Sequence, residues 1–341
     1  MFLKPPDRFM RAYIEAPIKA TLSVTDRCPL ECAHCYGDCA PSRDAHELST
    51  GEWLRIIDEA VEAGVMAVLI EGGEPLLRTD IVEILEHCRG RLMVWLRTHA
   101  VAVDAALARR VAQAGVAVVL VDLFGGTAAT HDRHAGVPDS FARSLAGMAA
   151  FRHENLDVVP LMILTRWNMG EVQDYLDLAA ALGCERAGIL RLYPIGRARQ
   201  RWAELACSLE EISAALVDAL PPPGLDLMHS WHPRDKNCCW ENSAVTADGR
   251  SVGCPYLREL VDYGNLRELS FATTWSHPLY RRLRAGPTGG GHCGGCEDHE
   301  GTRGGCRATA FAFTGDWEAQ DPFCSAANRG IDLRVLPLRD A

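Results

Sequence analysis

The sequence has no long hydrophobic run, no excess of basic residues and no internal repeat. Its first residues, MFLKPPDRFMRAYIEAP, lack the sustained apolar segment of an export signal, and no stretch reaches the roughly 20 apolar residues of a membrane-spanning helix. The formal net charge of −10 argues against a nucleic-acid partner, which normally requires a basic face. These absences predict a cytoplasmic protein that binds neither a membrane nor nucleic acid.

Cysteine, in contrast, is abundant. The chain has 14 cysteines in 341 residues, within the ordinary apolar and charged composition of a globular protein. Without an export signal, cysteines are expected in a reducing compartment, where they hold metal more often than they form disulfides. Four of them crowd into TDRCPLECAHCYGDCAP, residues 25–41. Structural zinc sites use CxxC pairs separated by a longer loop, whereas iron–sulfur ligands lie at short gaps, so this stretch favours an iron–sulfur cluster.

Short apolar strands alternate with amphipathic helices through the first two thirds of the chain. Strands are predicted at 18–25, 65–70, 91–97, 115–123, 156–165 and 186–193, with helices between them. One helix starts with the capping-box spacing of Ser49 and Glu52. We predict an α/β fold, a partial (β/α)6 barrel with helices outside its parallel strands; the alternation itself fits either an open or a closed barrel. Such barrels place their chemistry after the strands, where the four-cysteine stretch lies.

The alternation stops near residue 205. A helix at 208–220 leads to PPPG at 221–224, and the rest is rich in glycine and cysteine and poor in apolar periodicity. Such a segment needs metal to hold it together. The predicted organisation is an N-terminal extension (1–17), the barrel (18–205), a linker helix and proline-rich turn (206–224), a loop-rich, cysteine-rich module (225–330) and a tail (331–341).

The CxxxCxxC of Cys28, Cys32 and Cys35, directly after the first strand, resembles the radical S-adenosylmethionine (radical SAM) superfamily. The resemblance implies a [4Fe–4S] cluster held by these three cysteines, with S-adenosylmethionine on its open iron. Cys39 is then a bystander, although CxxCxxxC beginning at Cys32 is an alternative.

The GGEP turn after the second strand matches the superfamily's second motif. The resemblance assigns Gly72, Gly73 and Glu74 to the methionyl amine of S-adenosylmethionine. It also suggests that Arg166, after the fifth strand, meets the cofactor's carboxylate. The alternative for Arg166 is a surface arginine at a helix start.

The C-terminal cysteines resemble the SPASM extension, which binds auxiliary iron–sulfur clusters. The resemblance implies one set made of Cys238 or Cys239 or both, with Cys254 and Cys306, and a second made of Cys293, Cys296 and Cys324. The tail is most similar to the pyrroloquinoline-quinone peptide cyclase family and to haem-pathway relatives. Thr302 stands where a fourth ligand is usual, so Asp298, His299, Glu300 or substrate is expected to fill the gap, or the second cluster is two-iron or incomplete. Zinc is the alternative for Cys293 and Cys296.

Other strand ends depart from the family pattern. His99 stands where similar barrels have asparagine, and Asp122 and Phe124 stand where they have serine and aspartate. We therefore predict that Tyr36, His99 and Asp122 face substrate; simple drift with the fold retained is the alternative.

The resemblance implies that an external flavodoxin or ferredoxin reduces the cluster, that S-adenosylmethionine is cleaved to a 5′-deoxyadenosyl radical, and that this radical takes a hydrogen atom from substrate. One hypothesis is a peptide maturase, which oxidises or cross-links a ribosomally made peptide with auxiliary clusters as electron acceptors. Because only about 20 residues precede the barrel, a separate leader-peptide-binding protein is then expected. The second is a small-molecule enzyme acting on a tetrapyrrole, sugar or amino-acid metabolite, and the third is a non-catalytic iron–sulfur scaffold or redox sensor.

Overall fold

A single curved sheet organises the protein. The computed structural model describes residues 14–42, 46–230, 239–287 and 304–336. Its eight strands lie in the order β7-β6-β5-β4-β3-β2-β1-β8, and every neighbouring pair is parallel. The strands are β1 (Lys19–Ser23), β2 (Ala67–Glu71), β3 (Met93–Thr98), β4 (Val116–Asp122), β5 (Asp157–Ile163), β6 (Arg186–Leu190), β7 (Asp226–Ser230) and β8 (Asn242–Val245). The predicted α/β class, with a parallel sheet and helices outside it, is confirmed.

The sheet is larger than the predicted six strands. β7 pairs with β6, and β8 pairs with β1, with Lys19 opposite Asn242 and Leu22 opposite Val245. Both extra strands lie beyond residue 225, in the segment assigned to the C-terminal module. That module therefore starts inside the sheet, and β8 fixes part of it to the strand that precedes the cysteine loop.

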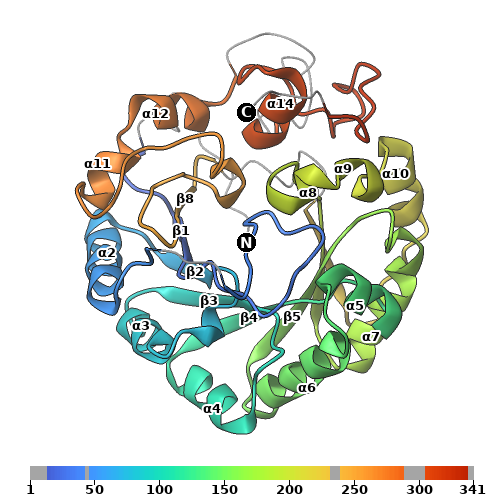
Figure 1. The fold of residues 1–341 in the computed structure, drawn as a ribbon, viewed down its shortest axis with the longest axis horizontal. Helices are drawn as coiled ribbons and strands as arrows, with labels where there is room; N and C mark the ends of the chain where they lie inside the picture. The colour runs from blue at the N-terminus through green and yellow to red at the C-terminus, as the bar shows by residue number, and fades with distance from the viewer. Residues whose placement is uncertain (1–13, 43–45, 231–238, 288–303, 337–341) are drawn as a thin grey trace.

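Helices follow the strands and cover the outside of the sheet (Figure 1). In the first part of the chain they are α2 (Thr50–Ala63), α3 (Ile81–Cys88), α4 (Ala105–Gln113), α5 (Ala128–Ala135), α6 (Ser140–His153) and α7 (Val172–Ala181), with short η1 (Pro75–Leu77) and η2 (Met169–Glu171). The predicted capping box is present, because Ser49 accepts a hydrogen bond from the Glu52 N–H and the Glu52 carboxylate accepts one from the Ser49 N–H. Ile56, Ile57 and Ala60 of α2 are buried against the sheet.

The later elements lie across the gap between the two edges of the curved sheet (Figure 1). They are α8 (Gly196–Gln200), α9 (Trp202–Leu205), α10 (Leu209–Val217), η4 (Pro255–Leu257), α11 (Phe271–Trp275), α12 (Pro278–Ala285) and α14 (Arg307–Thr314). A second apolar cluster holds this part together, and it includes Tyr193 and Ile195 from the barrel side and Tyr280 and Leu283 from α12. Within the described ranges, no helix is long and apolar enough to cross a membrane.

A buried ion pair joins the barrel to the C-terminal segment. Arg191, directly after β6, donates to the Asp321 carboxylate at 2.7 Å, and both side chains are fully buried. The same carboxylate accepts hydrogen bonds from the backbone N–H groups of Cys306 and Phe323. The Arg191 guanidinium also lies 4.2 Å from the centre of the Phe323 ring. One aspartate therefore pairs with the barrel arginine and orders the chain on both sides of α14.

Candidate functional site

A pocket of about 520 Å³, counting its open mouth, lies after the C-terminal ends of the strands. Its lining includes Cys28, Cys32, Cys35 and Cys39 from the loop after β1, Glu71 to Gly73 at the end of β2, Arg97 to His99 at the end of β3, Asp122 and Phe124 at the end of β4, and Arg197 of α8. The structure thus brings the predicted cluster ligands together with Gly72, Gly73 and the three predicted substrate-facing residues, Tyr36 among them.

The cysteine loop is held from several sides. The Arg197 guanidinium donates to the carbonyl oxygens of Cys32 and Cys39 at 2.9 and 2.8 Å. The N–H of Cys39 donates to the Cys35 sulfur at 3.4 Å. Hydrogen bonding from Cys39, helped by Arg197, lowers the pKa of the Cys35 thiol to about 6, whereas burial raises the pKa of Cys32. Cys35 is therefore prepared to be a thiolate, which is the form that binds iron.

The Gly72–Gly73 turn packs against this loop. The N–H of Gly73 donates to the Thr25 carbonyl at 2.7 Å, and the N–H of Glu74 donates to the Arg27 carbonyl at 2.8 Å. A Cβ on Gly73 would lie 2.3 Å from the Arg27 oxygen, which is closer than any real contact. Because Gly72 and Gly73 have no side chains, the turn can approach the cysteine loop closely. The N–H groups of Gly73 and Glu74 donate to carbonyl oxygens of that loop.

Replacing Gly73 by alanine is expected to destabilise the fold by about 1–3 kcal/mol, because the new methyl group must displace the Arg27 backbone. The check is urea unfolding under anaerobic conditions. Gly51→Ala in α2 is the matched control: a Cβ there meets nothing within 4 Å, so that variant should be stabilised by up to about 1 kcal/mol. Equal stability of the two variants would contradict the packing role of Gly73.

Glu74 is buried and its carboxylate is fully engaged. It accepts hydrogen bonds from the Thr98 hydroxyl at 2.7 and 2.8 Å, from the His99 N–H at 2.8 Å and from the Leu76 N–H at 3.1 Å. This carboxylate links the turn after β2 to the end of β3. Its position fixes two walls of the pocket relative to one another.

A buried arginine–carboxylate pair crosses the pocket. Arg97 of β3 donates to both oxygens of Asp122 on β4, with the shortest distance 2.7 Å, and lies 3.9 Å from Glu71. Tyr36 donates to Glu71 at 2.5 Å. His99 lies 3.9 Å from Asp122; burial lowers its pKa, but Cys28, Asp122 and Glu74 together raise it to about 10. The three predicted substrate-facing residues therefore belong to one charged network.

Sequence reasoning missed three members of the site, Glu71, Arg97 and Arg197. Glu71 and Arg97 lie at the C-terminal ends of the second and third strands, and that position was the signal available for them. Arg197 lies in LYPIGRA, a segment already similar to the family's sixth strand end, but its contact with the cysteine loop spans 165 residues.

Arg166 does not line this pocket. Its side chain, 43% exposed, lies 3.7 Å from Glu211 of α10, and its N–H donates to the Leu205 carbonyl. The chain leaves β5 at Ile163, and residues 165–168 turn outward, with Asn168 accepting from the Thr165 N–H. Arg166 is therefore partly exposed and lies close to α10, and its contact with the cofactor's carboxylate stays a prediction.

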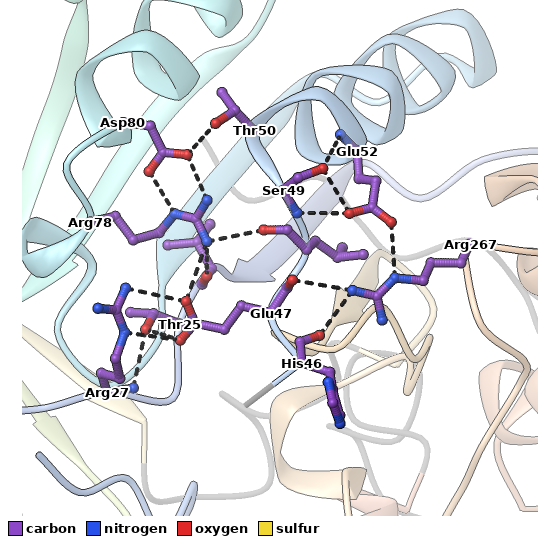
Figure 2. A network of polar contacts seen from close by, with 12 residues as sticks. Thr25, Arg27, His46, Glu47, Ser49, Thr50, Glu52, Arg78, Asp80 and Arg267 are labelled. Carbon is purple, nitrogen blue, oxygen red and sulfur yellow. Dashed lines mark hydrogen bonds and ion pairs between the residues drawn. The ribbon is translucent and has the colours of Figure 1, made fainter. Parts of the chain in front are cut away.

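A polar network closes the far end of the cysteine loop (Figure 2). Glu47 accepts hydrogen bonds from Thr25 and Arg27, so it ties the end of the loop back to its beginning. Arg78 donates to the carbonyls of Val24 and Leu48 and to Asp80. From the C-terminal segment, Arg267 donates to Glu52 and to the carbonyls at 46 and 47. The loop is therefore fixed by both parts of the chain.

The C-terminal cysteines are only partly described. Cys239, Cys254 and Cys306 are buried, and Cys324 is half-buried. Cys254 and Cys306 belong to the same apolar cluster, and Cys239 and Cys254 both contribute to the raised pKa of Tyr263, after burial itself. Cys238, Cys293, Cys296 and Thr302, with 298–300, lie outside the described residues. The three described members of the first predicted auxiliary set thus lie in one part of the structure.

The donor chemistry of the pocket fits an iron–sulfur cluster better than a single ion. Within residues 14–42, 46–230, 239–287 and 304–336, no three Cys, His, Asp or Glu side chains converge on a point where one metal ion would sit. In a cubane cluster each thiolate binds a different iron, so its ligands stand apart around a shared pocket. The thiols of Cys28, Cys32 and Cys35 lie on one loop around one hollow, which meets that requirement.

Comparison with known proteins agrees with this geometry. Residues 22–179 match the model of the "Radical SAM superfamily", and residues 238–297 match SPASM, an "Iron-sulfur cluster-binding domain". The PqqA peptide cyclase of Rhodopseudomonas palustris is 30% identical over 91% of this chain and 87% of that protein. The chain belongs to the radical SAM superfamily. The predicted resemblance is confirmed, and with it an enzyme with S-adenosylmethionine and iron–sulfur clusters as cofactors.

Two further proteins are similar to this radical SAM enzyme. The AdoMet-dependent heme synthase of Methanosarcina barkeri is 29% identical over 92% of the chain and 98% of that protein. Among solved structures, Streptococcus suis SuiB bound to S-adenosylmethionine superposes with a TM-score of 0.75 at 16% identity, covering 91% of this chain and 78% of SuiB. SuiB has also been solved with its precursor peptide SuiA. At that identity SuiB shows the fold alone.

Proposed function

We propose that this radical SAM/SPASM enzyme oxidises or cross-links a ribosomally made peptide in the reducing cytoplasm. The similarity to PqqA peptide cyclases supports a peptide substrate. When bound, the cluster and S-adenosylmethionine supply a 5′-deoxyadenosyl radical that removes a hydrogen atom from substrate, and auxiliary clusters accept an electron.

A peptide is favoured over a tetrapyrrole because both arginines of the pocket already have hydrogen-bond partners within the protein. Arg97 is held by both oxygens of Asp122 and lies beside Glu71, and Arg197 donates to the carbonyls of the cysteine loop. A tetrapyrrole with carboxylate side chains needs cations to receive them, and a buried unpaired carboxylate is costly. His99, whose raised pKa makes it a further cation of the pocket, already lies 3.9 Å from Asp122. A peptide with neutral or cationic side chains makes no such demand.

In this proposal the chain's own residues bind the cofactors and orient the substrate. Cys28, Cys32 and Cys35 hold the cluster. Because the N–H groups of Gly73 and Glu74 donate to the cysteine loop, the turn has carbonyl acceptors left to offer, which suits the methionyl ammonium. Glu74 positions that turn against β3, and Tyr36, His99 and Asp122 face the substrate.

The test pairs the anaerobically reconstituted enzyme, S-adenosylmethionine and dithionite with two kinds of substrate. The first is each peptide encoded by a short reading frame beside the gene, and the second is an iron tetrapyrrole with propionate side chains. We expect mass spectrometry to show a peptide that has lost two hydrogen atoms, with 5′-deoxyadenosine formed alongside.

The AdoMet-dependent heme synthase similarity, which spans 98% of that protein, makes tetrapyrrole chemistry the second candidate. A tetrapyrrole that loses carboxylate groups while every peptide stays unchanged would replace the peptide proposal by that candidate. Repeating the reaction with Asp122→Asn adds a readout of the pocket's charge, because freeing Arg97 should improve binding of the carboxylate-bearing substrate.

A further inference from the structure

The two carboxylate oxygens of Glu71 have different surroundings. Glu71 is the last residue of β2, and its buried side chain lines the pocket of the cysteine loop. Its Oε1 atom accepts hydrogen bonds from the Tyr36 hydroxyl at 2.5 Å and from the Ser23 hydroxyl at 3.3 Å. Its Oε2 atom accepts none from the residues that the structure describes, and Arg97 lies 3.9 Å from it, beyond hydrogen-bond distance. One oxygen therefore holds Glu71 in place, while the other keeps its lone pairs free.

The other carboxylates in this region are bonded on both oxygens. Asp122, which also lines the pocket, accepts hydrogen bonds from Arg97 on both of its oxygens, at 2.7 to 3.2 Å. Glu74 does not line the pocket, and both of its oxygens accept hydrogen bonds too. Of the acidic residues on the described pocket wall, Glu71 is thus the one that can accept a proton without first giving up a hydrogen bond.

Peptide oxidation has to release one proton inside this pocket. A peptide that is oxidised or cross-linked loses two hydrogen atoms. The 5′-deoxyadenosyl radical removes one of them as an atom, so the second has to leave as one electron and one proton, whichever bond is formed. In the proposed function the electron goes to an auxiliary cluster. The proton needs a base within hydrogen-bond reach of the substrate, and a positioned carboxylate can supply it.

We propose that Glu71 is the general base of peptide oxidation and accepts this proton on Oε2. The inference rests on the proposed function. A substrate C–H bond breaks first, and its hydrogen atom forms the new C–H bond at C5′ of 5′-deoxyadenosine. The substrate radical then loses one electron to an auxiliary cluster and one proton to Glu71 while the new bond of the product forms. The peptide thereby loses two electrons and two protons in total.

The test separates hydrogen-atom removal from proton removal. The holoenzyme, with S-adenosylmethionine and dithionite, receives the encoded peptide that wild type converts, prepared in perdeuterated form. Mass spectrometry gives the ratio of oxidised peptide to deuterium-labelled 5′-deoxyadenosine. Glu71→Gln is expected to lower this ratio by about a hundredfold or more, because the amide keeps an acceptor for Tyr36 but takes no proton. Its 5′-deoxyadenosine should still carry deuterium, and Glu71→Asp should recover part of the ratio.

Two matched amide variants and a binding measurement serve as controls. Asp122→Asn changes the other carboxylate of the pocket wall, and it should alter both products together and leave their ratio near that of wild type. Glu83→Gln makes the same substitution at an exposed position of α3 and should change neither product. Calorimetry without reductant should give Glu71→Gln a peptide affinity near that of wild type, because the amide has the size of the carboxylate.

A wild-type ratio in Glu71→Gln would overturn the inference, and with a lost peptide affinity it would make Glu71 a binding residue. A ratio lowered in Asp122→Asn alone would assign the proton to Asp122. A Glu71→Gln enzyme that forms no deuterated 5′-deoxyadenosine would also overturn the inference, because Glu71 would then act before the proton leaves. The proposed function fails separately if wild type leaves every peptide unchanged and removes carboxylate groups from the tetrapyrrole, whose radical loses carbon dioxide in place of a proton.

Discussion

Replacing Cys28, Cys32 and Cys35 together by alanine is expected to remove about four irons per chain and to abolish 5′-deoxyadenosine formation. The three thiols lie on one loop around one pocket, and the neighbouring Gly72–Gly73 turn is built against that loop. Without them, the pocket has no thiolate set to hold a cluster with an open iron. Iron counting after anaerobic reconstitution, with chromatography of the nucleoside product, measures both effects.

A second triple variant, of Cys88, Cys184 and Cys207, is the matched control. All three are buried and free, and none of them lines the pocket of the cysteine loop. The control should keep its iron and its activity. Cys39→Ala should also keep the cluster, whereas loss of about four irons from that single variant would favour the CxxCxxxC alternative that begins at Cys32. Full iron in the first triple variant would contradict the assigned ligands.

Asp321→Asn is expected to destabilise the protein by roughly 3–5 kcal/mol, because it leaves the buried Arg191 charge without its partner. Arg191 and Asp321 are both fully buried, and the Asp321 carboxylate also receives the N–H groups of Cys306 and Phe323. The amide keeps the size of the side chain but lacks the negative charge. Anaerobic urea unfolding, followed by tryptophan fluorescence, should show the loss.

The control for that variant is Asp332→Asn, which breaks an exposed pair with Arg334. Exposed pairs add little to stability, so its urea midpoint should remain near that of wild type. If both variants unfold at the same urea concentration, the buried pair does not join the barrel to the C-terminal segment as described. A loss of auxiliary-cluster iron in Asp321→Asn alone would show in addition that the pair orders the chain around Cys306.

The parts of the fold with local patterns were predictable from the sequence. Six strands alternate with helices, and each predicted strand overlaps an observed strand. These strands were predictable because each is a short apolar run bounded by turn residues, a pattern visible within the strand's own sequence. β8 is four residues, NSAV, and its partner β1 lies more than two hundred residues away. No periodicity is readable in so short a strand, and its pairing is a tertiary effect. β7 was hidden by the PPPG turn before it, which resembled a domain boundary.

The same distinction holds for the site. CxxxCxxC and GGEP are local patterns, and the three cysteines and two glycines they singled out do meet in one pocket, whereas the Glu74 carboxylate is bonded to Thr98 and His99 and does not line it. Arg166 was placed by analogy with a strand end, but side-chain direction there depends on the turn made by residues 165–168, and Arg166 pairs with Glu211. The Arg97–Asp122 pair depends on two strands being neighbours in register, so Asp122 could be suspected from its strand end while its partner could not.

The three-cysteine pocket of this chain is expected to cleave S-adenosylmethionine reductively. The most direct measurement is a single-turnover assay of the anaerobically reconstituted wild type with dithionite and S-adenosylmethionine, in which 5′-deoxyadenosine and methionine are quantified together. Both products are expected in equal amounts from wild type, and neither from the Cys28/Cys32/Cys35→Ala variant. A wild-type enzyme that carries its full iron yet forms no 5′-deoxyadenosine would contradict this expectation, and the iron–sulfur scaffold hypothesis would then take its place.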